Sequence, residues 1–217
     1  MNTEAAVRQM PKILQCAERA GIGHALFPGY GTLLGLVRNN ALIEHDDDTD
    51  FCVRADLVTP AQEYMFFNEL NDAGLFAERR RRRCRSDNNR ILWMSLKSEV
   101  DGCKSCIWFQ YFWHGYMWHS KGRRWTTKIG KRRGWDLDYE NTEAIAKGVP
   151  AKYMEGGFVQ REFYGHKYNV PLQYGSLLDV WYPFWLIPKK GGASSAHVYC
   201  AIGEWGDEST WKLRASG

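Results

Sequence analysis

Apolar residues recur at every third or fourth position in two segments near the start of the chain. Over residues 3–20 this spacing predicts an amphipathic helix, in which Pro11 indicates a kink or a late start. A second segment of the same kind covers residues 32–38 and ends at two asparagines. Between them, residues 24–28 (HALFP) are apolar and predict a short strand. The chain is therefore expected to begin as helix, strand, helix.

Strand-like patterns follow after residue 45. The acidic run at 46–50 (DDDTD) leads directly into the apolar residues 51–53, so its carboxylates are expected at the mouth of a strand. Thr-Pro-Ala-Gln at residues 59–62 is typical of a helix start and predicts a helix over residues 60–73. Further along, the pattern predicts strands over residues 75–85, 91–97, 106–113 and 116–120, a helical turn over 141–147, a hairpin over 158–170, a short helix over 172–181 and an ordered loop over 182–188.

These elements indicate the α+β class. We expect a small mixed sheet flanked by helices, with a β-rich insertion and a C-terminal cap. Residues 1–190 are expected to form this domain, and the Gly- and Ser-rich residues 191–217 a weakly specified C-terminal tail. A chain of 217 residues is long enough to bury a core without a disulfide or a metal.

The composition is that of an ordinary globular protein, with 44% hydrophobic and 25% charged residues, and it excludes general disorder. No apolar run approaches the roughly 20 residues of a membrane span, and the first residues lack the layout of a secretion signal. We therefore expect a cytoplasmic protein without a membrane span. Its six cysteines are not expected to form a disulfide framework.

Positive charge is concentrated in two runs, although the formal net charge is only +4. Residues 79–85 hold six arginines and residues 121–133 hold seven lysines and arginines, so the rest of the chain is acidic. Such runs either guard a strand edge or bind a phosphate-rich, polyanionic partner, and the sequence leaves both interpretations open. We find no zinc finger, basic helix or RNA-recognition motif, so nucleic acid is not the expected polyanion.

Asp48 and Asp50 are the strongest candidates for chemistry. One residue separates them, and side chains two apart on a strand point to the same face. Neighbouring carboxylates repel each other unless a cation lies between them. Mg²⁺ suits that position because it is a hard ion that prefers oxygen. A metal held there would neutralise and polarise a phosphoryl group.

A phosphate site is predicted shortly before the two aspartates. Gly31 and Thr32 follow the first strand and begin the next helix, where free backbone N–H groups favour an anion such as a nucleotide phosphate. Gly31 has no side chain to block the approach. Arg38, later on the same helix, is a further candidate to reach the phosphate. The order strand, Gly-Thr, helix and then Asp-x-Asp is more specific than any of its parts.

Two stretches of the chain resemble the LicD/fukutin family. Residues 30–38 (YGTLLGLVR), followed by residues 46–51 (DDDTDF), are similar to the family's signature. Near the C-terminus, residues 163–171, 174–178 and 181–183 are similar to its closing segment. The resemblance implies a nucleotidyltransferase-type fold over roughly residues 20–188.

The resemblance also implies an activity: transfer of a phosphorylated alcohol, such as phosphocholine or an alditol phosphate, from a CDP-linked donor to a glycan acceptor. It implies that Asp48 and Asp50 hold Mg²⁺ or Mn²⁺. Gly31 and Thr32 would contact the donor phosphate, and Arg38 would support that site. The acceptor hydroxyl would attack the phosphorus in line and CMP would leave, with catalysis supplied mostly by positioning and electrostatics.

Family members usually carry a third aspartate on a central strand, whereas residues 106–112 contain no acid. The general base is therefore unassigned: Asp101 lies five residues before Cys106, and His45 could serve as a proton acceptor, with a surface histidine as the favoured alternative. Two alternatives to the transferase remain open. One is a nucleotidyltransferase that acts on a small phosphorylated substrate. The other is a catalytically degenerate scaffold that binds a polyanion.

Two further groups have alternative interpretations. Cys103, Cys106, His114 and His119 could form a structural Zn²⁺ site, although buried thiols are the favoured explanation for the two cysteines. The aromatic residues Trp181, Tyr182 and Trp185 could stack on a sugar or a base, with packing in the core as the favoured alternative.

Overall fold

The computed structural model describes residues 2–46, 48–80, 93–97, 103–113, 115–120, 144–188, 198–202 and 212–214. In these ranges the helices are α1 Thr3–Arg19, α2 Tyr30–Asn39, α3 Pro60–Asp72 and α4 Tyr174–Trp181. The strands are β1 Leu26–Pro28, β2 Thr49–Arg54, β3 Ala77–Arg80, β4 Trp93–Lys97, β5 Lys104–Trp113, β6 Tyr116–Ser120, β7 Ala144–Pro150, β8 Phe158–Phe163, β9 His166–Pro171, β10 Val198–Ile202 and β11 Lys212–Arg214. The predicted α+β class is confirmed.

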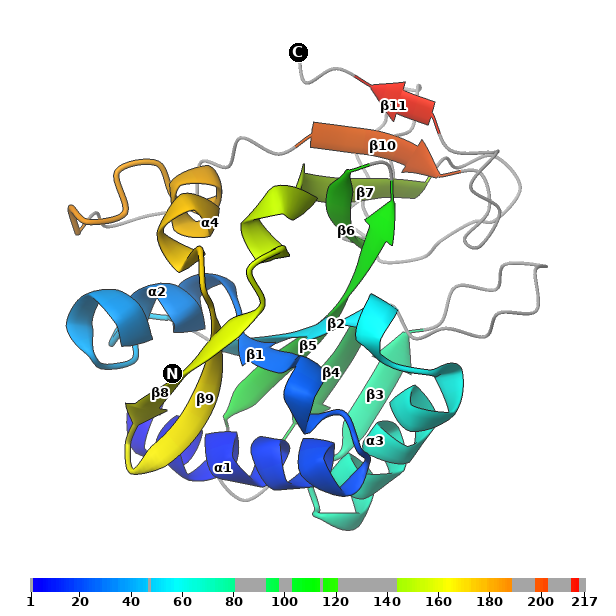
Figure 1. Ribbon diagram of the computed structural model, residues 1–217. Helices are drawn as coiled ribbons and strands as arrows, with labels where there is room; N and C mark the ends of the chain where they lie inside the picture. The colour runs from blue at the N-terminus through cyan, green and yellow to red at the C-terminus, as the bar shows by residue number, and fades with distance from the viewer. Residues whose placement is uncertain are drawn as a thin grey trace, which may run out of the picture.

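The central sheet is mixed and curled, with the strand order β1-β2-β5-β4-β3. Strands β2 and β5 run parallel, and the other neighbours in this order are antiparallel. Helices α1 and α3 lie side by side below the sheet in Figure 1, and the β8-β9 hairpin lies beside β1. Helix α2 packs on β2 and contacts α4. The predicted mixed sheet flanked by helices is therefore present.

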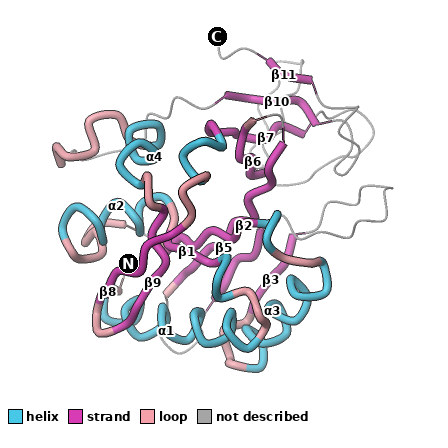
Figure 2. Tube along the Cα trace, in the orientation of Figure 1, coloured by secondary structure: helices cyan, strands magenta, loops and turns pink. Residues whose placement is uncertain are grey.

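The long strand β5 links this sheet to a second group of strands. Its last three residues, 111–113, pair with β6, which is followed by β7, β10 and β11 in antiparallel order (Figure 2). The helical turn predicted for residues 141–147 is wrong for its described part, because residues 144–147 belong to β7. Pairing with β6 and β10 on both sides decides this segment's conformation, and so overrides its local pattern. The described parts of residues 191–217 add β10 and β11 to the same sheet.

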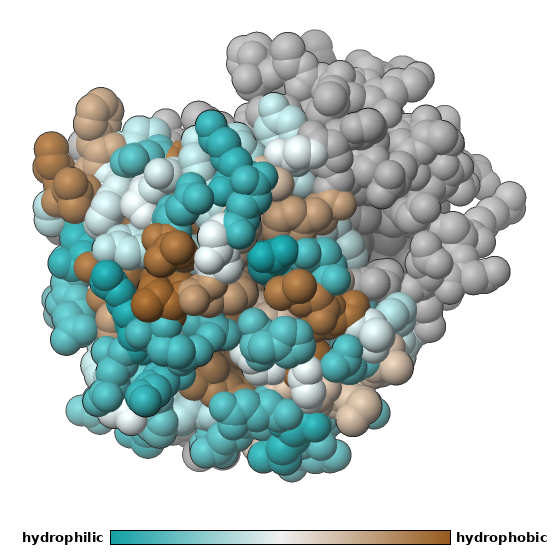
Figure 3. Space-filling view, in the orientation of Figure 1, coloured by the Kyte–Doolittle hydropathy of each residue, from teal (hydrophilic) through white to brown (hydrophobic). Residues whose placement is uncertain are grey.

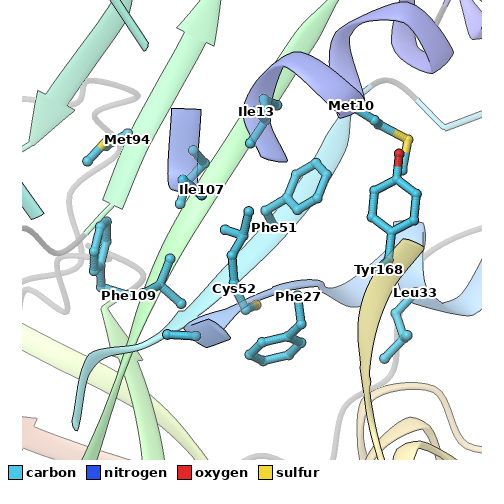
Figure 4. Close-up of a cluster of buried hydrophobic side chains, with 14 of the residues drawn as sticks. Met10, Ile13, Phe27, Leu33, Phe51, Cys52, Met94, Ile107, Phe109 and Tyr168 are labelled. Carbon is cyan, nitrogen blue, oxygen red and sulfur yellow. The ribbon is translucent and has the colours of Figure 1, made fainter. Parts of the chain in front are cut away.

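The core lies between the central sheet and α1 (Figure 4). Phe51 of β2, Ile107 and Phe109 of β5, and Ile13 of α1 are fully buried. Burial of side chains of this size contributes roughly 1.5–3 kcal/mol each. The next residue after Phe51, Cys52, points to the opposite side of the sheet, as strand geometry requires. Packing of one face of β2 thus leaves the alternate residues for the other face.

Two helix starts show how the sequence sets element boundaries. Helix α1 begins at Thr3, where the side chain of Asn2 accepts the N–H of Ala5, and the helix continues through Pro11. The predicted late start is therefore wrong. At α3 the capping box is confirmed: Thr59 Oγ1 accepts the N–H of Gln62 at 3.3 Å, and Gln62 Oε1 accepts the N–H of Thr59 at 2.9 Å.

The loop at residues 182–188, after α4, exposes apolar side chains. Phe184, Leu186 and Ile187 are 70%, 68% and 61% exposed there, and apolar surface gathers in this part of Figure 3. Among the described helices, none combines the length and the apolar character that crossing a membrane requires.

Candidate active site

The parallel pairing of β2 and β5 brings a polar group of side chains to one face of the sheet. Asp50 is paired with Cys106, and alternate residues of the two strands share that face. Lys104 Nζ lies 3.1 Å from Asp48 Oδ2. The Cys106 thiol is 3.6 Å from the same oxygen, to which it donates. Trp108 Nε1 donates to Asp50 Oδ1 at 2.8 Å. Three alternate residues of β5 thus contact the two carboxylates.

Three of these side chains form a donor set for a metal ion. One ligand atom each from Asp48, Asp50 and Cys106 lies within 4.8 Å of the other two. Ligand distances of about 2.0–2.3 Å would place two ligands of one ion at most about 4.6 Å apart, so small side-chain adjustments suffice. Two carboxylate oxygens and a sulfur therefore fit a single divalent ion.

In the metal-free protein Cys106 is a thiol. Its side chain is buried, and burial raises its pKa well above the ordinary value of 9.0. The negative charges of Asp50 and Asp48 raise the pKa further. The thiol proton is donated to Asp48. Without a bound cation, the sulfur of Cys106 therefore carries no charge.

The start of α2 is hydrogen-bonded to β2, the strand that contains Asp50. Thr32 Oγ1 accepts the backbone N–H of Asp50 at 2.8 Å, and the N–H of Gly29 donates to the Asp50 carbonyl at 2.9 Å. The first helical bond runs from Leu33 to Gly29, so the N–H groups of Gly31 and Thr32 have no acceptor within the helix. This end of α2 therefore lies beside the two aspartates, as the predicted phosphate site requires.

Gly31 has a second constraint, which the sequence did not reveal. A Cβ atom at this position would overlap with Oδ2 of Asp46, so any side chain would displace that carboxylate. A carboxylate at a helix N-terminus is stabilised by the helix dipole. Asp46 is thus a third acidic group near the site, in addition to Asp48 and Asp50.

Aromatic side chains line the same region. The Tyr30 ring lies 4.4 Å from the ring of Trp181 and 6.1 Å from that of Trp108, measured between centroids. Trp181 is 1% exposed and belongs to the core. Burial raises the pKa of Tyr182 well above its ordinary range, and the negative charges of Asp50 and Asp46 raise it further. Tyr182 therefore keeps its proton and can act as a donor.

Arg38 lies near the other end of α2. Six residues separate it from Thr32, which corresponds to about 9 Å along the helix axis. Its Nη1 donates to the carbonyl of Trp185 at 3.1 Å and its Nε to Asn39 Oδ1 at 3.0 Å. The guanidinium group therefore links the end of α2 to the loop after α4 by a hydrogen bond. Tyr182 belongs to the same loop. A contact with donor phosphate stays a prediction.

Other predicted residues fall partly outside the description. Cys103 and Cys106 are both buried, whereas His114 and the side chain of His119 lie outside the described residues, so the Zn²⁺ site stays a prediction. Residues 81–85 and 121–133, which hold most of the basic residues of the two runs, also lie outside them.

Lys104 and Trp108 were missed as site residues by the sequence argument, whereas Cys106 was considered only as a Zn²⁺ ligand and Tyr182 only for stacking on a sugar or a base. Residues 104, 106 and 108 of β5 alternate along the strand, so their side chains share the face of the sheet on which Asp50 lies. That alternation identifies them only once the register with β2 is known.

Comparison with known proteins agrees with this architecture. The sequence profile described as LicD/FKTN/FKRP, nucleotidyltransferase domain, matches residues 23–173, which include β1, α2, β2 and β5. No curated protein matches the chain. The matched range covers most of the chain and contains Gly31, Asp48 and Asp50. The chain therefore belongs to the LicD/FKTN/FKRP nucleotidyltransferase family.

Proposed function

We propose that the protein is a metal-dependent transferase that moves a phosphorylated alcohol from a CDP-linked donor to a glycan acceptor. Membership of the family supports a phosphotransferase-type enzyme. The observation that carries the proposal is the convergence of Asp48 and Asp50 at one face of β2, beside the start of α2. Phosphoryl chemistry requires both features: a place for a cation and a place for an anion.

In this proposal the acidic residues bind the cation, and the backbone N–H groups and a lysine interact with the donor phosphates. A divalent ion, Mg²⁺ or Mn²⁺, held by Asp48 and Asp50 would neutralise charge on the donor phosphates. The N–H groups of Gly31 and Thr32 orient a phosphate at the helix start. Lys104, whose ammonium group already lies 3.1 Å from Asp48, adds positive charge beside it.

The acceptor hydroxyl forms a new bond to phosphorus while the bond from phosphorus to the CMP oxygen breaks. Asp46 is a carboxylate near the site that lies outside the donor set, and we assign it the hydroxyl proton. Most of the rate enhancement on this scheme comes from positioning and electrostatics.

The absence of an acid among residues 104–113 of β5 favours one alternative, a degenerate scaffold that binds a polyanion. A nucleotidyltransferase would use the same cation and anion sites and differs in which side of the donor phosphorus is retained. Product analysis separates all three, because the scaffold gives no product and the two enzymes give different ones.

The test is incubation of the full chain with a panel of CDP-linked donors, glycan acceptors and Mg²⁺ or Mn²⁺, followed by mass spectrometry. Asp48→Ala and Asp50→Ala are expected to lower turnover at least about a hundredfold, because metal stabilisation of the transition state is worth several kcal/mol. Glu44→Gln removes an exposed carboxylate from the same segment and serves as the control. Turnover that survives in either aspartate variant, with circular dichroism unchanged, would refute the metal role.

A further inference from the structure

We propose that Cys106 is the third protein ligand of the divalent ion, and that its sulfur makes the site select a first-row transition metal ion over Mg²⁺. The inference rests on the metal site of the proposed function and specifies its chemistry. It concerns the strand position paired with Asp50, where a thiol lies beside two carboxylates.

The geometry places the sulfur between the two aspartates. Along β5, Lys104 contacts Asp48 and Trp108 contacts Asp50, and Cys106 lies midway between them on the same face. Its Sγ is 3.6 Å from Asp48 Oδ2, and the three ligand atoms lie within 4.8 Å of one another. The neighbouring contacts include those of Lys104 with Asp48 Oδ2 and of Trp108 with Asp50 Oδ1.

Packing alone does not explain a cysteine at this place. A thiol is a weak hydrogen-bond donor, so it compensates poorly for the partial burial of two carboxylates. Cys103 provides a contrast on the same segment: it is buried, and its thiol donates to the backbone carbonyl of Lys104. Cys103 is therefore an ordinary buried thiol, whereas Cys106 faces the charged group.

The sulfur sets the metal preference. A bound ion deprotonates a ligating thiol, and the proton passes to solvent. Thiolate is a soft ligand that favours ions such as Zn²⁺ and Co²⁺, whereas Mg²⁺ prefers an all-oxygen shell. Two carboxylates and one thiolate form a mixed set that still accepts Mn²⁺. We therefore expect Mn²⁺, Co²⁺ and Zn²⁺ to bind more tightly than Mg²⁺.

The experiment titrates the full chain with Co²⁺ and records the near-ultraviolet charge-transfer absorption that a cobalt–thiolate bond produces. Calorimetric titration with Mg²⁺, Mn²⁺ and Zn²⁺ gives the order of affinities. The variants are Cys106→Ser, Cys106→Asp and Asp50→Asn, with Cys103→Ser as the matched control. Thermal unfolding of each variant verifies its fold.

The proposal expects the absorption band in the unsubstituted protein and in Cys103→Ser, and its loss in Cys106→Ser and Asp50→Asn. Removing an outer partner of a metal ligand already costs about tenfold or more in affinity, so Cys106→Ser should weaken Zn²⁺ binding by at least that factor. Cys106→Asp should reverse the preference towards Mg²⁺. If the Cys106 variants do not fold, loss of the band in Asp50→Asn still links the thiolate to this site.

Three outcomes would overturn it. Co²⁺ that binds with no thiolate band, and is lost in Asp50→Asn, leaves the proposed function intact and removes Cys106 from the site. Loss of the band in Cys103→Ser with its retention in Asp50→Asn places the thiolate in a site that includes Cys103, such as the predicted Zn²⁺ site with His114 and His119, and not in the aspartate site. Absence of all metal binding defeats both this inference and the metal role in the proposed function.

Discussion

The indole N–H of Trp108 donates a hydrogen bond to Oδ1 of Asp50 across 2.8 Å, from β5 to β2. The same indole packs edge-to-face against Tyr30, the first residue of α2. Trp108 therefore holds the Asp50 carboxylate in one orientation and joins it to the helix start at which a phosphate would bind.

Trp108→Phe should lower turnover more than it lowers stability. The change removes one hydrogen bond to a charged group, worth about 1.5–3 kcal/mol when buried and less at this partly exposed site. Asp50 then loses its fixed orientation, and misplacement of a reacting group can cost up to about a hundredfold in rate. Turnover and urea unfolding measure the two effects separately.

Trp181→Phe is the control for that change. It removes the same volume of side chain, but Trp181 Nε1 has no hydrogen-bond partner among the described residues, so no donor is lost. An equal loss of turnover in both variants would show that packing around Tyr30, rather than the hydrogen bond to Asp50, is what matters.

Gly31→Ala should impair activity while leaving the fold in place. The new methyl group would collide with Asp46 Oδ2, and the short side chain of Asp46 can rotate away. We expect a loss of turnover of about tenfold to a hundredfold, since Asp46 is displaced from the site. Thermal unfolding should change little, because alanine favours the helix by about 1 kcal/mol relative to glycine.

The chain offers a matched control for this substitution. Residues 174–178 (YGSLL) begin α4 much as residues 30–34 (YGTLL) begin α2. A Cβ at Gly175 would meet no atom within 4 Å. Gly175→Ala should therefore preserve turnover and leave stability unchanged or slightly raised. A full-activity Gly31→Ala variant would remove Asp46 from the mechanism.

Lys104→Gln should strengthen metal binding. The ion pair with Asp48 has a half-exposed lysine, so its loss should change the free energy of unfolding by less than about 1 kcal/mol. The ammonium group, however, repels an incoming cation at short range, and its removal should raise divalent-ion affinity a few-fold. Calorimetry at low and high salt checks this, since the difference should shrink as salt screens the charge. A weaker affinity in the variant would contradict it.

Tyr168→Phe should stabilise the protein. The Tyr168 side chain is 1% exposed and lies next to Met10 in Figure 4, and its hydroxyl finds no hydrogen-bond partner in the described part of the chain. Removing a buried, unpaired hydroxyl is expected to raise the free energy of unfolding by about 1 kcal/mol at pH 7. Tyr164→Phe is the contrast: it loses a hydrogen bond from the N–H of Leu42 and should destabilise.

The benefit of Tyr168→Phe should grow in alkali. Burial raises the pKa of Tyr168 above its ordinary value of 10.0. Above pH 10 the unfolded chain loses this proton while the folded protein keeps it, so the stability of the unsubstituted protein falls as the pH rises. The difference between the two proteins should increase by up to about 1.4 kcal/mol at pH 11. Urea unfolding from pH 8 to pH 11 measures it, and a constant difference would contradict the assignment.

Local chemistry made much of this fold predictable. The capping box at Thr59 and the apolar strand residues 51–53 that follow Asp50 each depend on neighbours in the chain, and each matches the structure. Residues 144–147 were mistaken for a helical turn because their strand is defined by distant partners, β6 and β10.

The residues of the candidate site that lie close together in the chain could be predicted, whereas those contributed by a distant strand could not. Asp48, Asp50 and Gly31 lie within one short segment, where spacing alone brings them together. Cys106 and Trp108 join them only through the parallel register of β2 with β5, which no local pattern specifies. The missing acid on that strand was visible in the sequence, whereas the pairing of Cys106 with Asp50 was not.

The parallel pairing of β2 and β5 also has a consequence for how the protein matures. Asp48 and Lys104 are 56 residues apart in sequence, and parallel neighbours can meet only after a long crossover has closed. Such distant pairing is slow to form, so a nascent chain that ends before β5 has the two aspartates but lacks Cys106 and the strand that positions them. Once the crossover is complete, a bound ion stabilises the folded state and not the incomplete chain. Metal binding therefore distinguishes folded chains from incomplete ones.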